Sequence, residues 1–229
     1  MEFKDVKNEI LALAKKAVAY YNQYERIYKS TDPVELLTVV KDNARWCYNN
    51  KVISIELLEN WFSIPLLNEN YIFTSGENAV MVIQDTTILL LGASVANVET
   101  LTSITNVKTF DSSVANLETW FSSVAHLETF DSSVANVKTF ESSVANVKTF
   151  ESSIANCKTF KSSVANVLAF DSSVVNVKTF ESSVANVKAF ESSIANVNTS
   201  RSSVANVEAF DSSVANLDTF DSSLAKYKL

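Results

Sequence analysis

The residues with the clearest potential for intermolecular chemistry are carboxylates that recur every 20 positions in the C-terminal part of the chain. They form a candidate acidic interaction row that consists of Asp111, Asp131, Glu151, Asp171, Glu191 and Asp211. Such a row offers a docking surface to a basic partner, or an approximate mimic of nucleic-acid charge spacing. Nearby lysines such as Lys138 and Lys148 weaken the mimic hypothesis. The plain alternative is a solvated charge lattice that keeps the protein soluble.

Serine pairs, one histidine and two cysteines are the other candidates for chemistry. The pair Ser142-Ser143 recurs in almost every repeat, but a nucleophilic serine needs a positioned base, and none recurs with it. His126 stands alone, and Cys47 and Cys157 lie far apart without a CxxC spacing, which argues against a zinc site or a disulfide framework. We therefore expect no catalytic residue, no metal site, no cofactor and no enzymatic activity.

Asparagines hold one position of almost every repeat, and we interpret them as structural. Stacked amides can hydrogen-bond to one another along a ladder, and Asn tolerates a left-handed backbone conformation without glycine. In one set of alternate repeats, the predicted structural ladder consists of Asn116, Asn136, Asn156, Asn176, Asn196 and Asn216.

Composition and charge limit the class of protein. The chain has 229 residues, 47% of them hydrophobic, and a net charge of -7. Because an acidic surface disfavours nucleic acids and anionic membranes, we expect neither as a direct partner. The N-terminus lacks the order of a signal peptide, and polar residues 84–87 interrupt the most apolar run, so no membrane span is predicted. We expect a cytoplasmic protein, with leaderless export left open.

The first 65 residues have helical spacing. The pattern predicts one helix to about Ser30, a second from Pro33 to about Tyr48, and a third between Ser54 and Pro65. Asp32 can cap the second helix, since Glu35 completes a capping-box spacing. We therefore predict a helical cap domain at 1–68, a junction with irregular first rungs at 69–92, and a decapeptide-repeat domain at 93–229.

The repeat itself reads SSVANVKTFE at residues 142–151, and its residues are numbered here as positions 1 to 10. Its apolar positions 3, 6 and 9 would drift by about 80° per repeat on an α-helix, which leaves no lasting buried face. A period of two instead places small and apolar groups on one face of short strands. We assign Phe, the first Ser and Val to one inward face, and Ala, Val and Thr to the next, with corners between them.

The substitutions indicate how many repeats form one coil. Ala169, Ala189 and Ala209 replace Thr at intervals of 20, and every departure from an acidic position 10 falls in the alternate set that contains Phe121 and Lys161. Both observations favour a coil of two decads, although a recent duplication of 20-residue units would leave the same trace. The predicted fold is therefore α+β, a small helical domain followed by a β-solenoid.

The pentads ANVKT and ANLET resemble the A(N/D)LXX unit of pentapeptide-repeat proteins. This resemblance covers alternate pentads only, because FESSV and FDSSV place a large Phe where that family has a small residue. It implies a right-handed, four-sided β-helix. It also implies an alternative function, namely an acidic inhibitor of a DNA-binding enzyme such as a topoisomerase.

Our main functional hypothesis from the sequence is a non-enzymatic structural or interaction protein. The solenoid would act as a rigid scaffold or spacer, and the helical domain would anchor it. We expect a protein partner. Homodimerisation through the helical domain or through the C-terminal end of the solenoid remains open.

Overall fold

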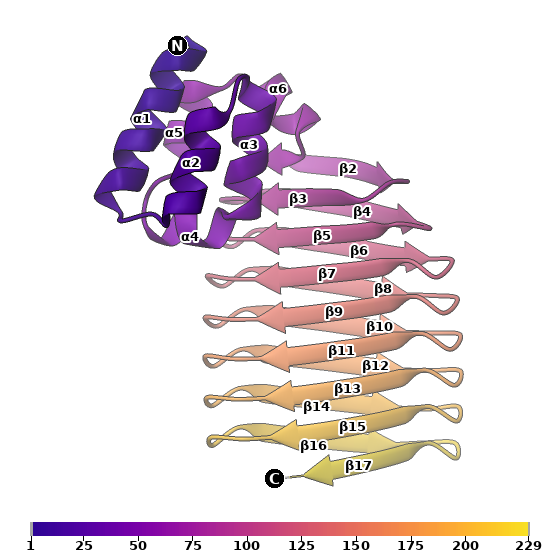
Figure 1. The fold of residues 1–229 in the computed structure, drawn as a ribbon. Coiled ribbons are helices and arrows are strands. Elements are labelled where there is room, and N and C mark those ends of the chain that lie inside the picture. Colours follow the sequence, from indigo (N-terminus) through magenta and orange to yellow (C-terminus); the bar gives the residue numbers. More distant parts are fainter. Residues whose placement is uncertain (1, 229) are drawn as a thin grey trace. The chain divides into compact units, whose positions relative to one another are not determined.

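The computed structural model describes residues 2–228 and separates the chain into two compact units, a helical unit up to Phe73 and a β unit from Thr74 onward (Figure 1). Each unit has its own buried core. The predicted class, a small helical domain followed by a β-solenoid, is confirmed.

The helical unit contains six helices within the described residues, where the sequence predicted three. A backbone break at residues 17–20, where Val18 has a φ of 56°, splits the first predicted helix, and Asn43 splits the second. The third predicted helix ends before Pro65 as expected, and Pro65 itself lies in the first turn of an additional helix, because a proline fits where no intrahelical N–H bond is needed. The helices are α1 (Phe3–Lys16), α2 (Tyr21–Lys29), α3 (Pro33–Asp42), α4 (Ala44–Asn49), α5 (Ile55–Trp61) and α6 (Ile64–Glu69).

The start of α3 has the predicted cap. Asp32 Oδ1 accepts a hydrogen bond of 3.0 Å from the Glu35 backbone N–H. Glu35 Oε2 in turn accepts one of 2.7 Å from the Thr31 backbone N–H, one residue earlier than in a standard capping box. These bonds satisfy backbone donors that a helix start leaves without intrahelical partners.

The core of the helical unit is aliphatic, with Ile10, Leu36 and Leu58 fully buried. The indole of Trp61 is also buried, and its Nε1–H donates a 2.8 Å hydrogen bond to the Glu9 carboxylate. This bond meets the usual need of a buried indole for a polar partner, so Trp61 has a packing role.

The β unit consists of short strands separated by tight turns, and the two-residue strand β1 (Ile72–Phe73) precedes it. Its strands are β2 (Glu77–Val82), β3 (Thr86–Leu90), β4 (Val95–Leu101), β5 (Ile104–Thr109), β6 (Val114–Trp120), β7 (Val124–Thr129), β8 (Val134–Thr139), β9 (Val144–Thr149), β10 (Ile154–Thr159), β11 (Val164–Ala169), β12 (Val174–Thr179), β13 (Val184–Ala189), β14 (Ile194–Thr199), β15 (Val204–Ala209), β16 (Val214–Thr219) and β17 (Leu224–Lys228).

Two parallel sheets form the solenoid. Strands with odd numbers from β3 to β17 form the odd sheet, and strands β2 to β16 with even numbers form the even sheet. In Figure 1 the odd strands lie in front and point left, the even strands lie behind and point right, and the chain descends, which makes the coil right-handed. The same hand is strongly preferred by parallel crossover connections in general.

The register confirms that one coil contains two decads. Ile154 pairs with Val174, and Val164 pairs with Val184, so each residue stacks on the one 20 positions further along. The first coils are shorter, since Glu77 pairs with Val95. The regular spacing of 20 begins with the pairing of β5 and β7.

Each decad forms one strand at positions 3–8 and one turn, which differs from the four five-residue faces implied by the pentapeptide-repeat resemblance. Ser143 at position 2 is buried, whereas Ser142 at position 1 is exposed and Val144 at position 3 faces outward. Our assignment of the first Ser and Val to an inward face was therefore wrong. The alternation runs unbroken from position 2 to position 8, so the inward row is Ser, Ala, Val and Thr.

The direction of the chain changes at positions 10 and 1, and both take left-handed backbone conformations. Asp131 and Ser132, for example, have φ values of 53° and 64°. The Ser133 N–H donates to the Phe130 carbonyl at 3.2 Å and closes the turn, as in the type I′ turns that join strands. The Ser132 N–H donates to the Glu151 carbonyl at 3.1 Å, so hydrogen bonds between coils continue through the turns.

Candidate interaction surfaces on the two turn edges

The turns form two edges that run along the solenoid. Turns that follow odd strands form the acidic edge, on the left in Figure 1, and turns that follow even strands form the mixed edge, on the right. The acidic edge comprises residues 110–113, 130–133, 150–153, 170–173, 190–193 and 210–213; the mixed edge comprises residues 120–123, 140–143, 160–163, 180–183, 200–203 and 220–223.

All six residues of the sequence-predicted acidic row lie on the acidic edge, at position 10 of its turns. They are Asp111, Asp131, Glu151, Asp171, Glu191 and Asp211. Adjacent coils of a parallel sheet are about 4.8 Å apart, so the row carries roughly one carboxylate per 4.8 Å. The row contains no basic residue. It is therefore a regular line of like charges.

Two carboxyl groups of the acidic edge have raised pKa values. Burial, and then the charge of Asp131, raise the pKa of Asp111 above its ordinary value. A side-chain hydrogen bond to Asp171, together with the charge of Asp171, raises the pKa of Glu191. Burial and neighbouring carboxylates therefore make the ionised forms of these two residues less favourable.

The mixed edge has the same turns but a different charge pattern. Its position 10 is occupied by Phe121, Glu141, Lys161, Glu181, Arg201 and Asp221. Lys161 pairs with Glu141 at 3.2 Å, and Arg201 pairs with Glu181 at 3.1 Å. Opposite charges in successive coils therefore compensate one another on this edge, although exposed pairs contribute only about 0–1 kcal/mol each.

Aromatic rings at position 9 stack along both edges. On the acidic edge, successive rings from Phe110 to Phe210 are 4.9–5.1 Å apart between centroids and nearly parallel. On the mixed edge, Trp120 begins a ladder that continues to Phe180, and Ser200 then occupies the next position. The aromatic ladder is thus continuous on the acidic edge and interrupted on the mixed edge.

The predicted Asn residues lie in two rows on the outer faces of the sheets. In the even sheet, the Asn136 Nδ2–H donates to Asn116 Oδ1 at 2.8 Å, and the same bond recurs at each coil up to Asn216. The odd sheet carries a corresponding row in which His126 takes one place, with its Nδ1 3.3 Å from the Asn146 amide nitrogen. These amides bond to one another along the coil axis, which holds the coils in register.

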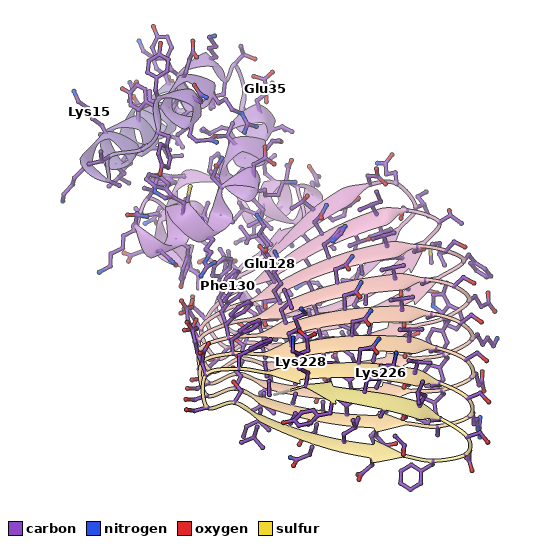
Figure 2. All side chains as sticks on the ribbon, turned by 60° about the horizontal axis from the view of Figure 1, so that its bottom comes forward. Lys15, Glu35, Glu128, Phe130, Lys226 and Lys228 are labelled. Carbon is purple, nitrogen blue, oxygen red and sulfur yellow. The ribbon has the colours of Figure 1, made fainter. Side chains whose placement is uncertain are left out.

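Figure 2 shows that side chains stand in rows along the solenoid, with Phe130 and Glu128 labelled. The row at position 7 differs between the two sheets. On the odd sheet Lys148 pairs with Glu128 and Lys188 with Glu208, whereas on the even sheet three lysines stack in succession. Position 7 differs between alternate repeats in the sequence itself, so sorting it by intervals of 20, as for position 10, reveals this difference.

The Cys157 thiol is buried inside the solenoid. Burial raises the pKa of Cys157 to about 12, so this thiol stays protonated. Within residues 2–228, no three His, Cys, Asp or Glu side chains gather in a way that could hold a metal ion. The helices in that range are also too short or too polar to span a membrane.

Comparison with known proteins finds no matching family model, no matching curated protein and no matching solved structure. The β-solenoid implied by the pentapeptide-repeat resemblance is present, but no family match supports membership of that family.

Proposed function

We propose that this chain is a non-enzymatic structural and interaction protein in which the solenoid is a rigid scaffold and the acidic edge is its docking surface for a basic partner. The observation that carries the proposal is the sorting of charge between two edges with the same backbone. One edge collects six carboxylates, while the other alternates acids and bases. A lattice of charges that served solubility alone would gain from alternation on both edges.

The rigidity of the scaffold is supported by three kinds of ladder. Backbone hydrogen bonds join each coil to the next, the Asn amides bond along both faces, and aromatic rings stack along the edges. Because each coil contacts the next in the same way, side chains on the surface keep a fixed spacing. A partner therefore meets a line of charges whose positions are already set, which lowers the entropic cost of binding.

The helical unit is the proposed anchor. Tyr20, Tyr21 and Tyr28 on and next to α2 are strongly exposed, and Val18 beside them is 85% exposed. Tyrosine is enriched in protein interfaces because its ring is apolar and its hydroxyl can bond to water or a partner. This surface supports a role of the helical unit in binding a second protein.

A second candidate function is inhibition of a DNA-binding enzyme, for which the acidic edge would stand in for nucleic acid. The charge density of the acidic edge is the reason why inhibition is the second candidate and not the first. The edge presents roughly one charge per 4.8 Å, whereas duplex DNA presents one per about 1.7 Å of its axis. The edge is therefore a sparse mimic. If this function holds, the chain should inhibit DNA supercoiling by a topoisomerase, and added duplex DNA should relieve the inhibition.

A titration with poly-lysine tests the docking surface. One variant neutralises three acidic-edge residues (Asp131→Asn, Glu151→Gln, Asp171→Asn), and a matched variant removes three charges from the mixed edge (Glu141→Gln, Glu181→Gln, Asp221→Asn). We expect the first to weaken binding about tenfold, because clustered charges act together, and the second to weaken it much less. Equal weakening in both variants would mean that net charge alone matters and would contradict the proposal.

A further inference from the structure

The outer face of the even sheet carries a row of three lysines, two of which have no acidic partner among the described residues. Lys138, Lys158 and Lys178 occupy the same position in three successive strands and pair in register. Like charges directly opposite each other in adjacent strands are destabilising. Lys138 is 2.8 Å from Glu118, but Lys158 and Lys178 have no carboxylate within 4.0 Å among residues 2–228. In this lysine row, the ammonium groups of Lys158 and Lys178 are therefore available to pair with carboxylates of another molecule.

A groove runs beside the lysine row. It has a volume of about 460 Å³ and lies between the lysines and the ladder that contains Asn136, Asn156 and Asn176. Each Asn of the ladder uses one of its two amide N–H donors on the Oδ1 of the neighbouring coil. The groove therefore offers the charges of the lysines together with the second amide N–H of each Asn.

The lysine row and the acidic edge have the same spacing. Both repeat once per coil of 20 residues, so both advance by about 4.8 Å per charge. A partner with an unrelated backbone would match three lysines only by coincidence. A second copy of this chain matches them coil for coil, because its acidic edge is built from the same repeat.

We infer that the lysine row of one copy binds the acidic edge of a second copy, so that solenoids associate side by side. This inference rests on the proposed function, since it names a partner for the acidic edge. The contact joins two different surfaces, and each copy keeps one of them free. Such a heterologous contact does not close upon itself, so further copies can add to the assembly.

Sedimentation velocity tests the inference. For the full chain in about 0.05 M salt, the average mass should rise above 25.2 kDa with concentration. In about 1 M salt, where the Debye length is about 3 Å, the mass should return to that of the monomer. A monomer at about 0.1 mM in low salt, or association that salt does not change, would overturn the inference.

Charge reversal identifies the surfaces. The face variant carries Lys158→Glu and Lys178→Glu, and the edge variant carries Asp131→Lys and Asp171→Lys. Both changes use residues that the repeat already accepts, since Glu118 holds position 7 and Lys161 holds position 10. Each variant alone should associate at least about tenfold more weakly than the wild type. An equimolar mixture should regain association, because the intact lysine row of the edge variant then meets the intact acidic edge of the face variant.

A control and two probes separate the remaining outcomes. Lys148→Glu with Lys188→Glu reverses the same position on the odd sheet and should not weaken association. If the mixture of variants stays monomeric, the inference fails. If the wild type stays monomeric but still binds poly-lysine through the acidic edge, the inference fails and the proposed function stands. If the wild type neither self-associates nor binds poly-lysine through the acidic edge, both the inference and the proposed function fail. Binding of poly-glutamate to the lysine row without self-association would assign that row to another acidic partner and would also overturn the inference.

Discussion

The two turn edges share one backbone and differ in their side chains, which separates what the fold requires from what a surface presents. Both edges use left-handed residues at positions 10 and 1, and each edge has turns in which the serine hydroxyl at position 2 donates to the carbonyl of position 9, as Ser133 and Ser143 do. Only the acidic edge has an unbroken ring ladder and carboxylates alone at position 10. The backbone of the turn thus accepts either charge pattern, and the pattern must have another cause.

The largest expected difference between the edges concerns the aromatic ladders. Phe170 stacks on rings in both neighbouring coils, whereas Phe180 stacks on Phe160 and faces Ser200 on its other side. We expect Phe170→Ala to lower the free energy of unfolding by about 3 kcal/mol and Phe180→Ala by about 2 kcal/mol, because one stacked pair contributes about 1 kcal/mol. Urea denaturation measures both. A larger loss for Phe180→Ala would contradict the stacking account.

The next test repairs the interruption on the mixed edge. Ser200→Phe would place a ring between Phe180 and Phe220 and extend the ladder. We expect a gain of about 1–2 kcal/mol in the free energy of unfolding from buried apolar area and stacking. Urea denaturation again provides the measurement, with Ser200→Leu as a control for apolar area without an aromatic ring. Destabilisation by Ser200→Phe would show that the site cannot hold a ring.

The carboxylates should give the edges opposite responses to neutralisation. The raised pKa values of Asp111 and Glu191 mean that these groups bind protons more tightly in the folded than in the unfolded chain. Their contribution to stability therefore rises as the pH falls through the raised pKa values, and it is complete below the ordinary values of 3.8 and 4.5. We expect the double variant Asp111→Asn, Glu191→Gln to have a higher melting temperature than the wild type at neutral pH. The variant should also lack the gain in stability on acidification that these two carboxyl groups give the wild type.

The control for that test lies at the same position of the mixed edge. Glu181→Gln breaks the pair with Arg201 and should lower the melting temperature slightly. Glu208 lies in β15 of the odd sheet and not on either edge, and its hydrogen bond to Lys188 lowers its pKa. The stability that Glu208 contributes therefore falls on acidification, in the variants as in the wild type. The comparison is therefore made between each variant and the wild type across the pH range. A common sign for both edges would contradict the account of crowded carboxylates.

The smallest expected effect is one that the two edges share. Ser162 on the mixed edge and Ser172 on the acidic edge have φ values of 63° and 61°. Glycine adopts this conformation without steric cost, but it also loses more backbone entropy on folding. We expect Ser162→Gly and Ser172→Gly to stabilise the protein by the same small amount, about 0.5 kcal/mol. Unequal effects in thermal unfolding would show that the turns are not equivalent.

The sequence predicted the coil of two decads because substitutions at positions 8 and 10 recur at intervals of 20, and the register of the strands confirms this spacing. Of the two corners predicted in each decad, the one between Thr and Phe coincides with the end of the strand, whereas Val and Ala lie within one strand. The left-handed residues of the turn were not predicted. Glycine is the usual marker of a left-handed residue, but here acidic, basic and serine residues adopt that conformation. Hydrogen bonds between stacked turns hold these residues in place, and such bonds form only once neighbouring coils are present.

The helical unit illustrates a second limit of sequence reasoning. The cap at Asp32 was predictable because the bonds are local. The break before α2 was not, because Val18 is a β-branched residue that rarely adopts a positive φ. On the surface, the acidic row was visible as a pattern of 20. The lysine row was not predicted from the sequence, because lysines that are close in the chain and share position 7 belong to different sheets.

A distance measurement tests most directly whether alternate decads lie on opposite edges, which underlies every difference between the acidic edge and the mixed edge. Spin labels would be attached to cysteines at residues 131 and 191, or at residues 131 and 141, after Cys47→Ala and Cys157→Val. The first pair is separated by three coils, or about 14 Å, and the second by the length of a strand with its turn, or about 25 Å. Dipolar EPR should therefore find the pair 60 residues apart closer than the pair 10 residues apart. The reverse order would contradict the two-edged solenoid.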